Sequence, residues 1–112
     1  MYKIYGIPNC NTVKKALTAL EQNKKPFEFI NFKKEPPTKP QLKVWKEAFG
    51  DWPANKKGPT FRKIKEEFEA STAAKKAQIL IDNSSAIKRP ILMKGTKVIS
   101  FGFDEEVYNK LK

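Results

Sequence analysis

The hydrophobic period of the chain changes twice within the first 32 residues, and no other feature constrains the fold as strongly. Residues 2–7 (YKIYGI) and residues 27–32 (FEFINF) place apolar side chains with a period near two, which predicts two β-strands. The segment between them has the i, i+3, i+4, i+7 spacing of a helix packed on a core, at Val13, Ala16, Leu17 and Leu20. The chain therefore begins in the order β-α-β.

The remainder of the chain adds a helical block, a hairpin and a last helix. Thr38 is suited to cap the first helix of the block, Gly50 to end it, and Asp104 to cap the last helix. A tight turn at residues 94–96 joins the two strands of the hairpin. The predicted elements are a helix over 39–49, a mostly helical region over 51–83, strands over 91–93 and 97–101, and a helix over 105–112.

This order of elements predicts a mixed sheet with helices on both faces. It matches the thioredoxin fold, an α/β fold, with a helical insertion at approximately residues 38–83 between the β-α-β half and the C-terminal hairpin-helix half. A chain of 112 residues is long enough for one ordinary core, so we expect residues 1–112 to form a single domain.

One cysteine and no histidine exclude several kinds of site. An internal disulfide needs a second thiol, a Cys/His zinc site needs more ligands, and Ser-His-Asp or Cys-His catalysis needs an imidazole base. No apolar run approaches the ~18 residues of a membrane span, and the N-terminus does not resemble a signal peptide. We therefore expect a soluble, cytoplasmic protein with no metal site and no tightly bound cofactor.

The basic residues are divided very unequally between lysine and arginine. The net charge of +11 comes from 23 basic and 12 acidic residues, and such a surface either attracts anions or is simply solvated. Of the 23, 21 are Lys and only Arg62 and Arg89 are Arg. Because a guanidinium alone offers a rigid fork for an oxyanion, these two residues are candidates for a functional site.

The only cysteine, Cys10, follows the first strand and a Pro8-Asn9 turn at the start of the first helix. Unpaired amides and the helix dipole favour the thiolate there, and such positions lower a thiol pKa from ~8.5 to roughly 3.5–7.5. The hydroxyl of Thr12 could donate to the sulfur, and Lys14 and Lys15 add positive charge. The alternative is a small cysteine packed under the sheet. Its polar neighbours favour the functional thiol.

Arg89-Pro90 is the second candidate feature. A proline that opens a strand in a thioredoxin-like domain is usually cis and lies beside the nucleophile, which would bring Arg89 near the sulfur of Cys10. The alternative is an ordinary proline that ends a helix, with Arg89 in solvent. Arg62 lies near the start of a highly charged helix, after the turn at Gly58-Pro59. Its local sequence alone predicts a side chain exposed to solvent.

Four segments of the chain together resemble one known family. They are YGIPNCNTVKKA, NKKGPTFRKI, IKRPIL and SFGFDEEVY, and they run along essentially the whole chain. They are similar to the arsenate reductase–like (ArsC/Spx) family, and above all to its YffB-type branch of small glutathione-dependent thiol reductases. The resemblance implies a thioredoxin-like fold with a helical insertion.

The resemblance also implies roles for individual residues. Cys10 falls on the catalytic cysteine, and Arg62 and Arg89 fall on the arginines that stabilise the thiolate and the arsenic oxyanion in arsenate-reducing relatives. From their positions around Cys10, rather than from the resemblance, we expect Asn11, Thr12, Lys14 and Pro90 to be substrate-binding residues. The chain departs from its relatives twice. The third arginine of the glutaredoxin-coupled arsenate reductases is missing from SFGFDEE, and Val13 replaces the second cysteine of the Spx-type Cys-x-x-Cys switch.

Three functions are consistent with these features. The first is a monothiol reductase in which Cys10 forms a mixed disulfide that glutathione, or another acidic low-molecular-weight thiol, resolves as co-substrate. The second is a glutaredoxin-coupled arsenate reductase, with glutaredoxin as its partner. The third is an Spx-like regulator that binds RNA polymerase. No basic motif interleaved with aromatic residues favours nucleic acid as a partner.

Overall fold

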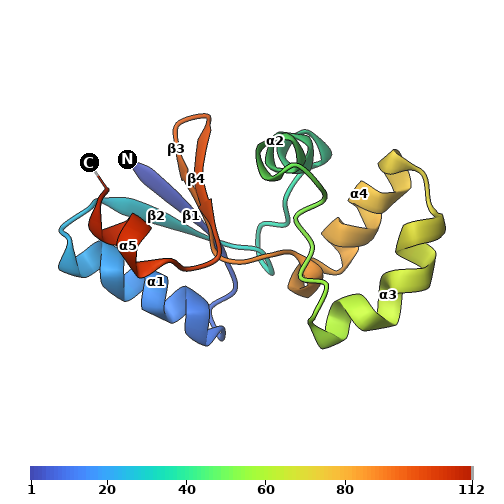
Figure 1. Cartoon of the computed structure of the whole chain (residues 1–112), viewed down its shortest axis with the longest axis horizontal. Helices are drawn as coiled ribbons and strands as arrows, with labels where there is room; N and C mark the ends of the chain where they lie inside the picture. The colour runs from blue at the N-terminus through green and yellow to red at the C-terminus, as the bar shows by residue number, and fades with distance from the viewer. Residues whose placement is uncertain (112) are drawn as a thin grey trace. The chain divides into compact units, whose positions relative to one another are not determined.

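The computed structural model describes residues 1–111, which divide into two compact units (Figure 1). We call residues 1–34 and 89–111 the thiol unit, because they include Cys10, and residues 35–88 the helical unit. The insertion expected at approximately residues 38–83 lies within the helical unit. That the chain forms a single domain stays a prediction.

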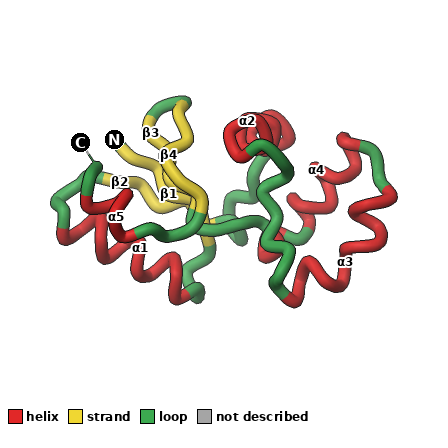
Figure 2. The backbone as a smooth tube through the Cα atoms, viewed as in Figure 1, coloured by secondary structure: helices red, strands yellow, loops and turns green. Residues whose placement is uncertain are grey.

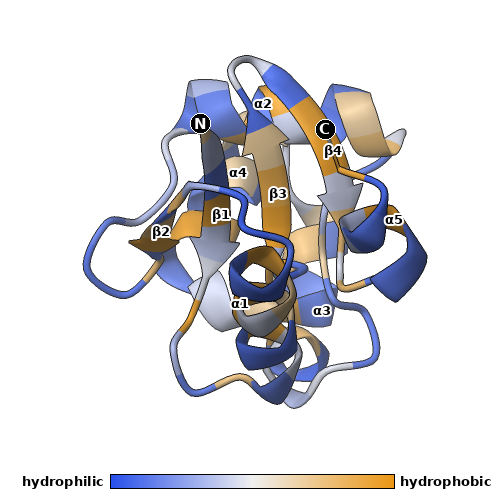
Figure 3. Cartoon of the chain, turned by 90° about the vertical axis from the view of Figure 1, so that its left-hand side faces the viewer, coloured by the Kyte–Doolittle hydropathy of each residue, from blue (hydrophilic) through white to orange (hydrophobic). Residues whose placement is uncertain are grey.

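Among residues 1–111, the thiol unit has a four-stranded sheet, drawn in yellow in Figure 2, and Figure 3 shows its strand order β2-β1-β3-β4. β1 pairs in parallel with β2 and antiparallel with β3, and β3 pairs antiparallel with β4. The mixed sheet predicted from the order of elements is therefore confirmed. The strands are β1 (Tyr2–Gly6), β2 (Phe27–Asn31), β3 (Ile91–Lys94) and β4 (Lys97–Phe101).

Helices α1 (Asn11–Gln22) and α5 (Glu105–Asn109) lie on the same face of this sheet (Figures 1 and 3). α1 buries the predicted stripe toward the strands, and its buried residues are Val13, Ala16, Ala19 and Leu20. Leu20 is completely buried beside Ile4, Leu92 and Tyr108. Full burial of one such side chain stabilises a fold by about 1.5–3 kcal/mol. That helices also cover the opposite face of the sheet stays a prediction.

The last helix begins where the sequence predicts and ends earlier. The Asp104 carboxylate accepts hydrogen bonds from the amides of Glu106 at 3.0 Å and Val107 at 3.5 Å, so Asp104 is the N-cap. α5 ends at Asn109, because the amide of Lys110 bonds back to the carbonyls of Glu106 and Val107 and closes the last turn. The predicted end at residue 112 lies outside the described residues.

Within residues 35–88, the helical unit contains three α-helices and one short 3₁₀ helix. Thr38 caps the first of them by accepting from the amide of Gln41, and Gly50 ends it with φ of 88°. Thr72 caps the third helix by accepting from Lys75. The elements are α2 (Lys39–Phe49), α3 (Pro59–Ala70), α4 (Ala73–Asp82) and η1 (Ser84–Ala86). The helical character predicted for this region is confirmed.

Aromatic side chains supply much of the packing in the helical unit. Trp45 is completely buried, and the rings of Phe61 and Phe68 meet edge to face with centroids 5.4 Å apart. Trp52 meets Phe68 in the same way, at 6.1 Å. No helix within residues 1–111 is long and apolar enough to cross a membrane.

Candidate active site

Cys10 occupies the N-cap position of α1. Its backbone is extended, with φ of −102° and ψ of 124°, and its carbonyl accepts the first helical hydrogen bond from Lys14 at 3.0 Å. The local sequence explains this arrangement, because β1 ends at Gly6 and the Pro8-Asn9 turn separates the strand from the helix. The thiol is half-buried. Cys10 therefore lies at the strand-to-helix junction that the sequence predicts.

Neighbouring groups lower the pKa of Cys10 below its ordinary value. Burial of the thiol is the largest single effect and raises the pKa, but the amides of Val13 and Thr12 and the charge of Arg89 together outweigh it. The sulfur of Cys10 accepts no hydrogen bond of regular N-cap geometry. The amides of Thr12 and Val13 therefore stabilise the negative charge of the thiolate as dipoles that point toward it. The arrangement favours a thiolate.

The source of the lowered pKa differs in part from the sequence interpretation. Thr12 acts through its backbone amide, whereas the sequence suggested its hydroxyl. Lys14 and Lys15 are not among the groups that shift the pKa. Both lysines are exposed, and solvent screens their charges.

Arg89 and Pro90 approach Cys10 from the other end of the chain. The peptide bond between them is cis, as the sequence predicts, and the carbonyl of Pro90 accepts a hydrogen bond from the amide of Gly102 at 2.8 Å. Pro90 is buried and Arg89 is partly buried. The guanidinium of Arg89 lowers the pKa of Cys10 both through its charge and through a hydrogen bond to the sulfur. The structure thus brings Arg89 and Cys10 together.

Gly6 keeps this junction compact, and the sequence interpretation missed it. A Cβ atom on Gly6 would lie 2.8 Å from Cγ2 of Val13 and 3.8 Å from Cβ of Arg89. Only a residue without a side chain lets the end of β1 pass so close to α1. A glycine inside a strand pattern, four residues before the cysteine, is a signal of close backbone approach that could have identified it.

Arg62 belongs to the helical unit. It lies in the first turn of α3, where its amide donates to the carbonyl of Gly58 at 3.2 Å, and its side chain is exposed. Cys10 and Arg62 are in different units, so a role of Arg62 at the thiol stays a prediction.

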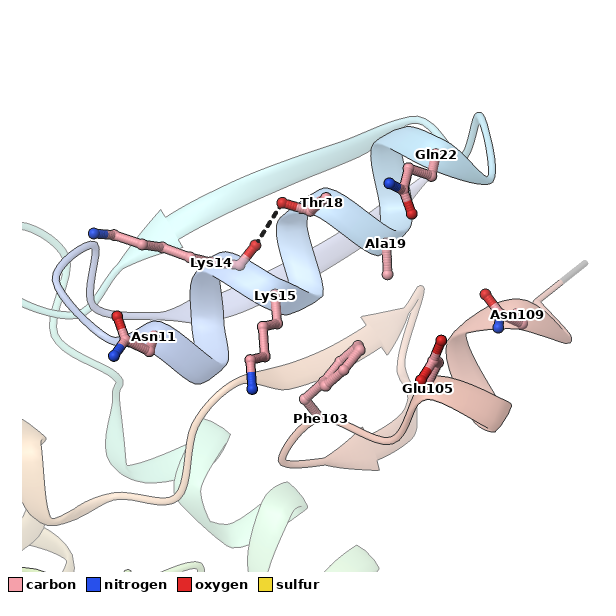
Figure 4. A pocket seen from close by; sticks show the side chains of 9 residues that line it. All are labelled: Asn11, Lys14, Lys15, Thr18, Ala19, Gln22, Phe103, Glu105 and Asn109. Carbon is pink, nitrogen blue, oxygen red and sulfur yellow. Dashed lines mark hydrogen bonds between the residues drawn. The ribbon is translucent and has the colours of Figure 1, made fainter.

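A groove of about 540 Å³ begins at Asn11, the residue after Cys10, and follows α1 along its outer face to α5 (Figure 4). Figure 4 shows the ammonium of Lys15 near one end and the carboxylate of Glu105 on the opposite wall. The lining residues are Asn11, Lys14, Lys15, Thr18, Ala19, Gln22, Phe103, Glu105 and Asn109. Of these, the sequence predicts Asn11 and Lys14 as substrate-binding residues. It misses Phe103 and Glu105, because only the packing of α5 beside α1 brings them to the groove.

The described residues contain no group of three or more Cys, Asp or Glu side chains that could hold a metal ion. The chemistry that the arrangement supports is nucleophilic attack by the thiolate of Cys10. Arg89 and the amides at the start of α1 are placed to stabilise a negative charge on the sulfur or on a group bound to it.

Comparison with known proteins identifies the family. A profile of the ArsC family matches residues 5–111, nearly the whole chain. The chain belongs to the ArsC family. This membership confirms the resemblance seen in the four sequence segments and, with the element order described above, the thioredoxin-like fold. Membership of this family makes the chain an arsenate reductase-like, thiol-based oxidoreductase.

Individual relatives are similar over nearly their full length. A protein of known structure named YFFB is 34% identical, with a TM-score of 0.85 and 96% of both chains covered. An arsenate reductase (ArsC) related protein from Brucella melitensis is 33% identical, with a TM-score of 0.73 and coverage of 98% of this chain and 95% of that one. An uncharacterized protein of Haemophilus influenzae is 33% identical over 110 residues, 96% of either chain.

Proposed function

We propose that this ArsC-family protein is a glutathione-dependent monothiol reductase. The observation that carries the proposal is the position of Cys10, whose thiolate is favoured by the start of α1 and by Arg89. The chain has no second cysteine that could resolve an adduct. A thiol from outside the chain must therefore complete each cycle, and we propose glutathione for this role.

The reaction consists of two thiol–disulfide exchanges. The thiolate of Cys10 attacks one sulfur of a disulfide substrate, a new S–S bond forms to Cys10, and the other sulfur leaves as a thiolate that takes a proton from solvent. A glutathione thiolate then attacks the mixed disulfide on its outer sulfur. Oxidised glutathione, or the corresponding glutathione mixed disulfide, leaves and the thiolate of Cys10 is regenerated. Each cycle therefore consumes one disulfide and one glutathione thiol, and it releases one thiol and one disulfide that contains glutathione.

The charges of the groove suit glutathione as the co-substrate. Glutathione carries two carboxylates and one ammonium group, and the groove offers the ammonium of Lys15 near Asn11 and the carboxylate of Glu105 across from it. Arg62 is proposed to bind a carboxylate or another anionic group of the substrate from the helical unit. Glutathione is abundant in reducing compartments, so a cytoplasmic location is part of this proposal.

The experiment that tests the function measures reduction of a glutathione mixed disulfide, coupled to glutathione reductase and the consumption of NADPH. The Cys10→Ser variant is expected to show only the background rate, because serine cannot form the adduct. Mass spectrometry of the wild-type protein after exposure to oxidised glutathione should show one added glutathione. Turnover by Cys10→Ser equal to that of the wild type would refute the proposal.

A second variant tests the recognition of glutathione separately. Lys15→Gln is expected to raise KM for the glutathione mixed disulfide about twofold to fivefold with little change in kcat, because one exposed charge contact is lost. The matched control is Lys97→Gln, an exposed lysine on β4 outside the groove. An equal KM for Lys15→Gln and Lys97→Gln would remove the groove from the proposal and leave the role of Cys10 intact.

Arsenate reduction is a second candidate, favoured by the similarity to the arsenate reductase-related protein from Brucella melitensis. In that reaction Cys10 would bind arsenate, and a glutaredoxin would reduce the glutathionylated arsenic adduct. The segment SFGFDEE offers no third arginine for the oxyanion. Arsenate-dependent consumption of NADPH in a glutaredoxin-coupled assay would establish this activity, and a flat trace would exclude it.

A further inference from the structure

A second pocket lies entirely within the helical unit, and nothing in the proposed reductase reaction uses it. Its volume is about 370 Å³, within the range of small-ligand sites. It lies where the end of α2, the loop that follows, and the last residue of the unit come together. The lining residues are Phe49, Asp51, Ala54, Asn55, Lys56, Lys57 and Lys88.

Backbone hydrogen bonds hold the walls of this pocket in place. The amide of Asn55 donates to the carbonyl of Ala86, and the amide of Lys88 donates to the carbonyl of Pro53, each at 2.7 Å. Both bonds flank the isolated β-bridge between Ala54 and Ile87. The loop that carries three of the charged residues is therefore fixed to the segment that carries Lys88.

The pocket has an excess of positive charge. Asp51 pairs with Lys56, whose ammonium lies 3.2 Å from its carboxylate, and the amide of Trp52 and this lysine both lower the pKa of Asp51. The aspartate therefore stays ionised and offsets one of the three lysines. The charges of Lys57 and Lys88 remain. Two lysines that line a pocket beside a backbone-fixed loop suit a phosphate group, for which lysine acts as a compact point charge.

An exposed aromatic ring completes the lining. The side chain of Phe49 is 40% exposed, and the ammonium of Lys88 lies 5.3 Å from the centroid of its ring. A large apolar side chain exposed at a pocket is a contact surface for a planar ring of a ligand. The volume also exceeds what a phosphate ion needs, since one water molecule takes about 30 Å³. The site therefore combines a place for an anion with a place for an aromatic group.

We propose that this pocket binds a nucleoside monophosphate, with its phosphate at Lys57 and Lys88 and its base against Phe49. All of the lining residues belong to the helical unit, so the proposal does not depend on the reductase function. Lys88 immediately precedes Arg89 in the chain, where the helical unit ends and the thiol unit resumes.

The test uses the ¹⁵N-labelled full chain, titrated with adenosine monophosphate and followed by amide NMR at constant ionic strength. Inorganic phosphate and adenosine are titrated separately, because they carry the two halves of the ligand. Binding is expected to shift the amides of residues 49–58 and 86–88, with a lower Kd for the nucleotide than for either half. Equal affinity for inorganic phosphate, or shifts spread over the lysines of the whole surface, would overturn the proposal.

Two variants locate the site. Lys57→Gln and Lys88→Gln are each expected to weaken nucleotide binding about tenfold, as loss of a charged hydrogen bond does. The matched control is Lys65→Gln, an exposed lysine of α3 that does not line the pocket. Lys57 and Lys65 are exposed and Lys88 is half-buried, and the spectra of all three variants should remain those of a folded chain. Unchanged affinity in both pocket variants, or an equal loss in Lys65→Gln, would contradict the assignment.

Discussion

The thiol unit and the helical unit carry different kinds of chemistry. The groups that lower the pKa of Cys10 are the amides of Thr12 and Val13 and the guanidinium of Arg89, and they belong to the thiol unit. The helical unit instead holds Arg62 and the lysine-lined pocket, where charge is available for binding. The comparison teaches that the reactivity of Cys10 should change with substitutions near it in the thiol unit and should not change with substitutions in the helical unit.

The strongest test of this comparison replaces each of the two arginines with methionine, one at a time. Arg89→Met is expected to raise the pKa of Cys10, because it removes both a positive charge and a hydrogen bond from the thiolate. The pH midpoint of alkylation by iodoacetamide should move upward, and the rate at pH 7 should fall because a smaller fraction of the thiol is ionised. Stopped-flow alkylation across the pH range measures both quantities.

Arg62→Met is the matched substitution in the other unit. Its alkylation midpoint should equal that of the wild type, while KM for the glutathione mixed disulfide should rise. An upward shift of the midpoint as large as that of Arg89→Met would break the comparison, since Arg62 would then act directly on the thiolate.

Two glycines provide the next test, on stability. Gly6→Ala should lower the free energy of unfolding by about 1–3 kcal/mol, because its Cβ would lie 2.8 Å from Cγ2 of buried Val13. Gly58→Ala in the helical unit should cost less, because the nearest atom is the amide nitrogen of Asn55, at 2.9 Å at the end of a side chain that can rotate. Urea unfolding of both variants measures the difference.

A double variant separates the crowding at Gly6 from other effects. Gly6→Ala with Val13→Ala removes the methyl groups that the new side chain meets. Its loss of stability should be smaller than the sum of the two single losses, as expected for residues in contact. Strictly additive losses would show that Val13 is not the obstacle.

The smallest expected effect is that of Tyr108→Phe in the thiol unit. The phenol of Tyr108 is completely buried, and its oxygen and that of Ser100 make no hydrogen bond of regular geometry within the described residues. Removing the hydroxyl therefore leaves no partner unsatisfied, and the free energy of unfolding at pH 7 should change by less than about 1 kcal/mol. A loss above about 2 kcal/mol would instead reveal a strong hydrogen bond.

The same variant has a signature at high pH. Burial raises the pKa of Tyr108 to about 12, and the neighbouring hydroxyl of Ser100 lowers it only in part. Because the folded protein favours the neutral phenol, this contribution to stability is complete below pH 10 and is lost as the pH rises through about 12. Wild type should therefore lose stability across this interval more steeply than Tyr108→Phe. Parallel curves would contradict the raised pKa.

The local features of the fold could be predicted from the sequence because their causes lie within a few residues. The stripe from Val13 to Leu20 specifies α1, and the side chains of Thr38 and Asp104 cap helices at the predicted positions. The position of Cys10 also follows from local pattern alone. The short helix η1 was not predicted, because its three residues carry no periodic signal.

The features that escaped prediction depend on segments far apart in the sequence. The groove beside α1 exists because α5 packs there, as in the hydrogen bond from Asn23 to Asn109 at 3.1 Å. Gly6 is constrained by Cγ2 of Val13, which comes close only when α1 packs against the end of β1. Likewise, the pocket of the helical unit needs Lys88 beside the loop after α2. No periodicity or capping rule contains such long-range information.

The solitary state of Cys10 has a consequence for how long the protein keeps an oxidised form. Without a second cysteine, the chain cannot release a mixed-disulfide adduct by forming an internal disulfide. In the proposed reaction the adduct persists until an external thiol attacks it, so its lifetime depends on the concentration of reduced thiol in the surroundings. While it persists, it also shields the sulfur from irreversible oxidation to sulfinic or sulfonic acid. In the proposed reaction the oxidised protein therefore accumulates when reduced thiol is scarce, and it becomes active again when the thiol concentration recovers.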